Sequence, residues 1–272
     1  MDKPIILKFN NMERILEYKI STETILQIMQ YICDNSIYSY QEQICNGFIT
    51  IKGGHRVGIA GSAVIENGKI INLKYISCLN FRIAKQIIGA ADKIIEHIID
   101  IPNSTIHNTL IVSPPGAGKT TMLRDLIRQI SNGIPRYSFD GKSVGVVDER
   151  GEIAAIYHGI SQNNLGIRTD VMNNIPKGIG MKMLIRSMSP QVIVADEIGG
   201  KEDVEAINYG ICCGVKGIFT AHGKFLEDLQ LNKTLNDLIH TYIFDNIIFL
   251  SSKIKGEVEK IYTLDKAHKE YV

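Results

Sequence analysis

The sequence predicts an α/β protein in which a larger domain with a mainly parallel sheet follows a small α+β domain. From about residue 103 onward, apolar runs alternate with amphipathic stretches of helical period. This alternation is typical of parallel strands joined by crossover helices. Before that point, short helical segments precede strands of alternating polarity. A Pro-Asn-Ser-Thr stretch separates the two patterns, so we expect domains at 1–102 and 103–272.

In the N-terminal domain, apolar residues at helical spacing follow Ser21 and Thr22, which are suitable helix caps. A second short helix is expected before the first strand. Asn67 and Gly68 form a hairpin signal between two strand-like segments. A further helix is expected over about 85–99, where isoleucines recur at helical spacing.

In the C-terminal domain, the expected strands are 109–112, 143–147, 192–195, 217–220 and 246–250. The third of these is continuously apolar, as strands buried on both faces of a parallel sheet are. The stretch 159–180 is polar, rich in glycine and without periodicity. We expect it to form a long loop, and loops of that length are more often functional than idle.

A phosphate-binding loop is predicted between the first strand of this domain and the helix that follows it. Gly116 and Gly118 permit positive φ, so that several backbone N–H groups can turn toward an anion. Lys119 would supply a charge for the β- and γ-phosphates, and Thr120 a hydroxyl ligand for Mg²⁺. The alternative is a glycine-rich turn that binds nothing. The expected nucleotide-binding residues are Ser113, Pro114, Pro115, Gly116, Ala117, Gly118, Lys119, Thr120, Thr121 and His222.

Two acids, Asp196 and Glu197, end the third expected strand. Because the carboxyl ends of parallel strands face the ligand crevice, these side chains are expected beside the phosphate-binding loop. Asp196 is placed to hold Mg²⁺, and Glu197 to orient and deprotonate an attacking water. An acidic pair that only caps the next turn is the alternative.

Two other expected strands also end in polar residues. Asp148, Glu149 and Glu152 follow the second strand, where they could position water or metal, and one of them could instead pair with Arg150. The fourth strand ends in a segment that carries Thr220 and His222, an arrangement suited to sensing a γ-phosphate. A lone histidine at a strand end is often structural.

Composition limits the classes of partner. The formal net charge is +1, so bulk electrostatics give no support for binding nucleic acid, and none is predicted. The five cysteines are odd in number and lack Cys-x-x-Cys spacing, which favours a reducing cytoplasm over a disulfide framework. No apolar run approaches the ~20 residues that a transmembrane helix needs. We therefore expect a cytoplasmic protein that reaches a membrane only through a partner.

Several segments together resemble those of a known superfamily. In order they are 113–120, 148–152, 184–190, 192–197 and 220–223. Together these five segments follow the order of the secretion ATPases of the type II and type IV systems. In that superfamily the corresponding elements are called the Walker A, Asp box, Walker B and His box. Segments 54–61 and 77–84 narrow the resemblance to the stage III sporulation protein AA family of endospore-forming bacteria. The chain has Asp196-Glu197 where many secretion ATPases have Gly-Glu, which leaves open which acid has which role.

This resemblance implies a RecA-like P-loop ATPase domain, preceded by the small α+β domain, and a homo-hexameric ring that hydrolyses ATP with Mg²⁺. It implies a motor that energises a channel apparatus between mother cell and forespore, recruited on the mother-cell side by membrane proteins. In the superfamily, arginines of the N-terminal domain reach the nucleotide, and Arg56 and Arg82 lie in the matching segments. Judged from the residues alone, both arginines read as solvated strand positions.

The reaction that we expect is attack of water on the γ-phosphate of ATP, with Glu197 or Glu152 preparing the water and Lys119, Arg82 and Arg56 stabilising charge. One rival is a small-molecule P-loop kinase or nucleotide switch, which would need an acceptor pocket or lid. A second rival is a DNA-associated RecA-like ATPase, which would show DNA-stimulated turnover and salt-sensitive binding.

Overall fold

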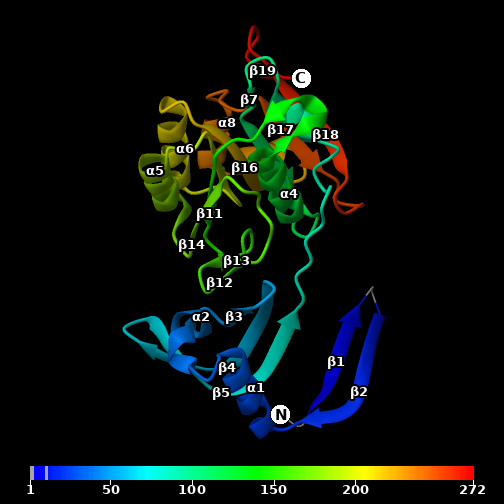
Figure 1. Cartoon of the computed structure of the whole chain (residues 1–272), viewed down its shortest axis with the longest axis vertical. Coiled ribbons are helices and arrows are strands. Elements are labelled where there is room, and N and C mark those ends of the chain that lie inside the picture. The colour runs from blue at the N-terminus through cyan, green and yellow to red at the C-terminus, as the bar shows by residue number, and fades with distance from the viewer. Residues whose placement is uncertain (1–2, 10–11) are drawn as a thin grey trace. The chain divides into compact units, whose positions relative to one another are not determined.

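The structure is a computed structural model that describes residues 3–9 and 12–272 (Figure 1). Its residues group into two units, Met1–Lys85 with Tyr157–Gln162, and Gln86–Ile156 with Asn163–Val272. Residues 86–102, which we expected in the N-terminal domain, thus group with the second unit. The physical reason is packing: Ile94, Ile95 and Ile98 are fully buried in the core of that unit.

The first unit is an α+β unit with a three-stranded antiparallel sheet. Its elements are β1 (Lys3–Phe9), β2 (Met12–Ile20), α1 (Thr22–Ile32), the 3₁₀ helix η1 (Ile37–Tyr40), α2 (Gln41–Cys45), β3 (Phe48–Ile51), β4 (His55–Glu66) and β5 (Lys69–Arg82). The sheet has the order β3-β4-β5, and β1 and β2 form a separate hairpin for which the sequence analysis predicts no element.

Local signals in this unit act as their chemistry predicts. The Ser21 hydroxyl accepts a hydrogen bond from the Thr24 N–H at 3.1 Å and so caps α1. Asn67 and Gly68 both have positive φ, 48° and 75°, and form the tight turn between β4 and β5. The core of the unit forms where α1 and α2 cover the sheet, and it includes Met29, Ile44, Ile49 and Val57.

The second unit is built on an eight-stranded sheet with the order β14-β11-β15-β16-β8-β17-β18-β19. The first six of these strands are parallel, and β18 and β19 are antiparallel additions at one edge. The strands of the sheet are β8 (Thr109–Ser113), β11 (Val144–Asp148), β14 (Thr169–Asn173), β15 (Val192–Ala195), β16 (Lys216–His222), β17 (Asn246–Leu250), β18 (Val258–Asp265) and β19 (Glu270–Tyr271). All five strands expected in this domain are present, and the predicted α/β class with a mainly parallel sheet is confirmed.

The remaining elements connect these strands. The helices are α3 (Ile95–Ile98), α4 (Lys119–Asn132), the 3₁₀ helix η2 (Pro135–Tyr137), α5 (Lys177–Met188), α6 (Lys201–Cys212), α7 (Leu226–Leu231) and α8 (Lys233–Ile239). The short strand pairs are β6 (Ile99–Asp100) with β7 (Thr105–Ile106), β9 (Gly133–Ile134) with β10 (Phe139–Asp140), and β12 (Ile156–Tyr157) with β13 (Ile160–Ser161).

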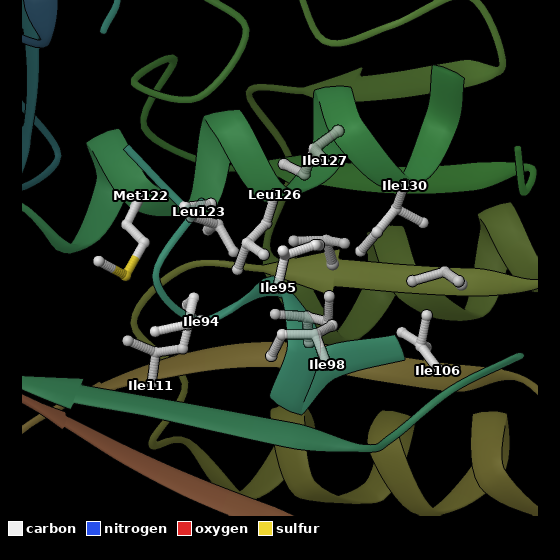
Figure 2. Close-up of a cluster of buried hydrophobic side chains, with 14 of the residues drawn as sticks. Ile94, Ile95, Ile98, Ile106, Ile111, Met122, Leu123, Leu126, Ile127 and Ile130 are labelled. Carbon is white, nitrogen blue, oxygen red and sulfur yellow. The ribbon is translucent and has the colours of Figure 1, made fainter. Parts of the chain in front are cut away.

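Alternate residues of the buried strands feed two hydrophobic cores, one on each face of the sheet. On one face, Ile111 of β8 packs with α3 and with Leu123, Leu126 and Ile130 of α4 (Figure 2). On the other face, the neighbouring Leu110 and Val112 pack with α5, α6 and α8. Period-two alternation in a strand covered on both sides explains why the strand sequences are apolar throughout. The result is a three-layer arrangement with β8 inside the sheet.

Two expectations about this unit are wrong. The helix expected over 85–99 is reduced to the four residues of α3, because Gly89 has a φ of 83° and turns the chain before it. The long loop expected over 159–180 contains β14, a parallel edge strand beside β11, and the start of α5. The sequence of β14 is polar and lacks the apolar pattern of a buried strand, because an edge strand needs only partial burial.

Among residues 3–9 and 12–272, no helix combines the length and the apolar character needed to cross a lipid bilayer.

Candidate nucleotide site

The phosphate-binding loop predicted from the sequence lies between β8, which ends at Ser113, and α4, which begins at Lys119. Gly116 and Gly118 have φ values of 79° and 102°, a backbone region that residues with a Cβ rarely adopt. Gly118 is also the N-cap of α4. The loop therefore takes the backbone form that turns amide groups toward a bound anion, in line with the positive end of the helix dipole.

Lys119 is the first residue of α4, and its side chain is buried although it carries a charge. Its Nζ lies 4.0 Å from Asp196 Oδ1 and 3.7 Å from Glu197 Oε1, distances too long for hydrogen bonds. Within the described parts of the chain, this ammonium has no hydrogen-bond partner. Burial lowers the pKa of Lys119, and the two carboxylates oppose that shift. A buried cation with unused donors is the feature that a bound phosphate would satisfy.

Asp196 follows β15 and is held by two threonine hydroxyls. Thr120 Oγ1 donates to Asp196 Oδ2 at 2.7 Å, and the Thr220 hydroxyl donates to the other carboxylate oxygen. Thr220 lies on β16, the parallel neighbour of β15, so the sheet itself brings these groups together. A hydroxyl and a carboxylate are hard oxygen ligands of the kind that Mg²⁺ prefers. The oxygen atoms of Thr120 and Asp196 are thus suitable ligands for the Mg²⁺ that the sequence predicts there.

Glu197 adopts a φ of 54°, which is unusual for a residue with a side chain. Its N–H donates to the Thr220 hydroxyl at 2.8 Å, and this bond helps to fix the bend of the backbone. Its carboxylate contacts Arg150, and His222 Nε2 lies 2.9 Å from Oε1. Backbone strain of this kind persists where the surroundings enforce it, and it is concentrated at functional sites.

The turn after β11 is organised by a buried acid. Asp148 accepts hydrogen bonds from the N–H groups of Glu152 and Ala154, both at 2.8 Å, and of Ile153 at 3.0 Å. Burial raises the pKa of Asp148, while these N–H groups act to lower it. Arg124 of α4 donates to the Glu152 carbonyl at 2.6 and 3.0 Å. Asp148 is therefore committed to shaping the turn, and it does not line the surface around Lys119.

The other charged residues of this turn also have partners. Glu149 pairs with Lys177 at the start of α5. Arg150 pairs with Glu197 rather than with one of the acids beside it in sequence, which was the possibility raised above. Of the acids in this segment, only Glu152 lines both of the hollows that flank the phosphate-binding loop and this turn.

Most of the predicted site residues line two adjacent hollows. The first is lined by Pro114, Pro115, Gly116, Gly118, Lys119, Thr120, Thr121, Glu152, Glu197, His222 and Lys255. The second is lined by residues of the turn after β11, by Lys177 and by the pair Asp196 and Glu197. Of the remaining residues of the loop, Ser113 and Ala117 are buried. Glu152 and Glu197 border both hollows, so the acids lie at the junction between phosphate loop and acidic turn.

Arg56 and Arg82 belong to the first unit. They are direct cross-strand partners in the β4–β5 ladder, and the Arg56 guanidinium lies 3.3 Å from the centre of the Phe48 ring. Directly opposed residues of an antiparallel pair share one face of the sheet, so the two arginine side chains start from neighbouring positions on that face.

Sequence reasoning missed Lys255, which lines the first hollow from the turn between β17 and β18. The signal available was the run of polar residues with two lysines after the last expected strand. To use that signal, the position of this strand beside β8 would have had to be known.

Comparison with known proteins identifies the relatives of the chain. A family model described as "Sporulation stage III, protein AA" matches residues 1–268. Stage III sporulation protein AA of Bacillus subtilis (strain 168) is 39% identical over 266 residues, which cover 97% of this chain and 85% of that protein.

Solved structures give a fold comparison. The Legionella pneumophila ATPase DotB superposes with a TM-score of 0.59 at 14% identity, and the match covers 100% of this chain and 73% of DotB. The pilus retraction motor PilT, solved with bound ADP, gives 0.59 at 13% identity and covers 91% of this chain and 71% of PilT. At such low identity these likenesses show the fold alone, which this chain shares with DotB and PilT.

Proposed function

The chain belongs to the sporulation stage III protein AA family, and from that membership and the site geometry we propose that it is an ATP-hydrolysing motor of the secretion-ATPase type. The observation that carries the proposal is the Lys119 ammonium, which is buried at the start of α4 within 4.0 Å of two acids and, in the described part of the chain, has no hydrogen-bond partner. A structural lysine would normally reach solvent or a partner, because a buried charge with unused donors is costly. A phosphate group removes that cost.

In this proposal the triphosphate of ATP lies along residues 113–121. The loop amides and the N-terminal end of α4 bind phosphate oxygens, and Lys119 binds the β- and γ-phosphates. Thr120 and Asp196 would hold Mg²⁺, which would neutralise charge on the phosphates. The hydrogen bond of 2.7 Å from Thr120 Oγ1 to Asp196 Oδ2 supports this assignment, since it places the two oxygens close enough to bind the same cation.

Glu197 is the acid that we propose as the general base. It lies 3.7 Å from Lys119, which marks the reacting end of the triphosphate, and its backbone carries the kind of strain that is concentrated at functional sites. His222 and Arg150, which contact this carboxylate, would hold it in place and respond when the γ-phosphate leaves. Glu152 borders the same hollow and is the second candidate for this role.

Arg82 and Arg56 are proposed as guanidinium groups that stabilise charge developing on the transferred phosphoryl group. Their side-by-side placement on one face of the β4–β5 ladder supports an anion-binding role. Because they belong to the N-terminal unit, their engagement would couple nucleotide state to movement of that unit. Such coupling is what a motor requires.

At the level of the cell, we propose that the chain assembles as a homo-hexamer in the cytoplasm of the mother cell. Membrane proteins would recruit it there, and it would energise a channel apparatus between mother cell and forespore. Family membership and the likeness in fold to DotB and PilT support this part of the proposal.

The test is phosphate release from ATP by the purified full chain, measured beside the mass of the particle with and without a non-hydrolysable ATP analogue. We expect release that needs Mg²⁺, proceeds without an added acceptor and is unchanged by DNA, together with a nucleotide-promoted hexamer. Release that requires an acceptor molecule would point to a kinase, and DNA-stimulated release to a DNA-associated ATPase.

A further inference from the structure

The turn between β17 and β18 is fastened to the phosphate-binding loop. β17 is the parallel neighbour of β8, so both strands end at the same edge of the sheet. The turn, residues 251–257, is closed by a hydrogen bond from the Ser251 N–H to the Glu257 carbonyl at 2.8 Å. The Gly256 N–H then donates to the carbonyl of Ala117, also at 2.8 Å. This last bond ties the turn to the phosphate-binding loop.

The contact between turn and loop is close. A Cβ on Gly118 would lie 3.3 Å from the Gly256 nitrogen and 3.4 Å from Lys255 Cγ. Glycine at position 118 permits the φ of 102° and also leaves room for the close approach of the turn. The aliphatic stem of Lys255 thus lies close to Gly118 of the phosphate-binding loop, and Lys255 lines the same hollow as Lys119.

Lys255 has a charge that the fold does not use. It is exposed, and within residues 3–9 and 12–272 it forms no ion pair. Lys119, in contrast, is buried between Asp196 and Glu197. Two lysines therefore line the hollow, Lys119 within 4.0 Å of both acids and Lys255 with its stem close to Gly118.

From this arrangement we infer that Lys255 is a second phosphate-binding residue, one that contacts the phosphates retained in the product, nucleoside diphosphate. The inference rests on the proposed nucleotide site. The acids and Lys119 mark where the γ-phosphate reacts, whereas the stem of Lys255 lies at Gly118 and, among the described residues, Lys255 forms no ion pair with Glu152 or Glu197. A cation at that place interacts equally with ATP and ADP. It therefore provides uniform binding and does not select the transition state.

The experiment is calorimetric titration of the full chain with Mg-ADP and with Mg plus a non-hydrolysable ATP analogue. Lys255→Ala is compared with Lys253→Ala, a matched control that removes a lysine from the same turn but not from the hollow. Lys255→Arg restores the charge, and Lys255→Gln keeps the stem if Lys255→Ala should fold poorly. Each titration is repeated at low and high salt.

We expect Lys255→Ala to lower the affinity for both nucleotides by the same factor. That factor should be about tenfold, as for the loss of one charge-assisted hydrogen bond at an exposed site. The salt dependence of binding should also become shallower, because one cation no longer contacts phosphate. Lys253→Ala should match the wild type, and Lys255→Arg should recover most of the affinity.

Three results would overturn the inference. Equal affinities for Lys255→Ala and Lys253→Ala would show that the position binds nothing. Weakening of the triphosphate analogue alone would place the cation at the transferred phosphate. If the wild type itself binds neither nucleotide, the proposed function fails too, and that outcome is distinct from the other two because it does not depend on Lys255.

Discussion

Replacing Lys119 with methionine separates a phosphate ligand from a structural ion pair. Methionine keeps the buried stem and removes the charge. Loss of hydration for an ammonium without hydrogen bonds costs several kcal/mol. Attraction to the two carboxylates at 3.7 and 4.0 Å contributes about 4 kcal/mol each at an effective dielectric constant of ~20. The two attractions together come to about 8 kcal/mol, and the lowered pKa of Lys119, with burial as its largest cause, implies a loss of hydration of at least that size.

We therefore expect the nucleotide-free Lys119→Met variant to be as stable as the wild type or up to about 2 kcal/mol more stable. For a domain of this size that is a rise in Tm of up to about 8 °C. With nucleotide at 100 times its Kd, the wild type should gain about 2.7 kcal/mol, a shift of roughly 5–11 °C. The variant should show almost no nucleotide-dependent shift, because its phosphate ligand is missing.

The pH dependence has a definite sign. The pKa of Lys119 in the folded chain lies below its ordinary value of 10.5, so at alkaline pH the unfolded chain binds more protons than the folded one. The cost of the buried charge is thus greatest at neutral pH and falls as pH rises toward 10.5. The Tm difference between variant and wild type should shrink over the same range. Thermal shift assays at several pH values measure both effects. A nucleotide-free variant that melts more than ~4 °C below wild type, yet keeps the nucleotide shift, would refute the reasoning.

Two further substitutions test other parts of the site. Glu152→Gln should slow phosphate release less than tenfold, because the first candidate for the general base is Glu197; a larger loss than in Glu197→Gln would transfer that role to Glu152. Arg82→Ala, and to a lesser degree Arg56→Ala, should lower turnover by as much as ~10³-fold, the lower end for arginines in phosphoryl transfer, with changes in stability of about 1 kcal/mol or less. ATPase rate and Tm are measured on the same preparations, and full activity in the double variant would remove both arginines from the mechanism.

The parts of the fold that could be read from the sequence are those set by local chemistry. Residues 192–195 are apolar throughout because the strand is covered on both faces, and the boundaries match the structure. The phosphate-binding loop was recognisable because its glycines must adopt positive φ. The acids at 196 and 197 were placed beside it because parallel strands end at one edge of a sheet.

Other features depend on contacts that the local sequence does not contain. Residues 85–99 have helical periodicity, and Ile94, Ile95 and Ile98 are buried as that period implies, yet Gly89 turns the backbone out of a helix. Asp148 reads as a possible ligand, but burial under three backbone N–H groups makes it a structural residue. Lys255 could be predicted as a site residue only if the strand order were known, because the neighbouring positions of β17 and β8 bring its turn to the site.

The central claim is that this site hydrolyses ATP with Glu197 as the general base. It is tested most directly by measuring phosphate release and ATP affinity of Glu197→Gln beside the wild type. Glutamine keeps the size and most hydrogen bonds of the side chain but cannot accept the proton of water. The account predicts that release slows by about 10²–10⁴-fold while ATP affinity stays within a few-fold of wild type. Release at the wild-type rate from a variant that binds ATP normally would contradict it.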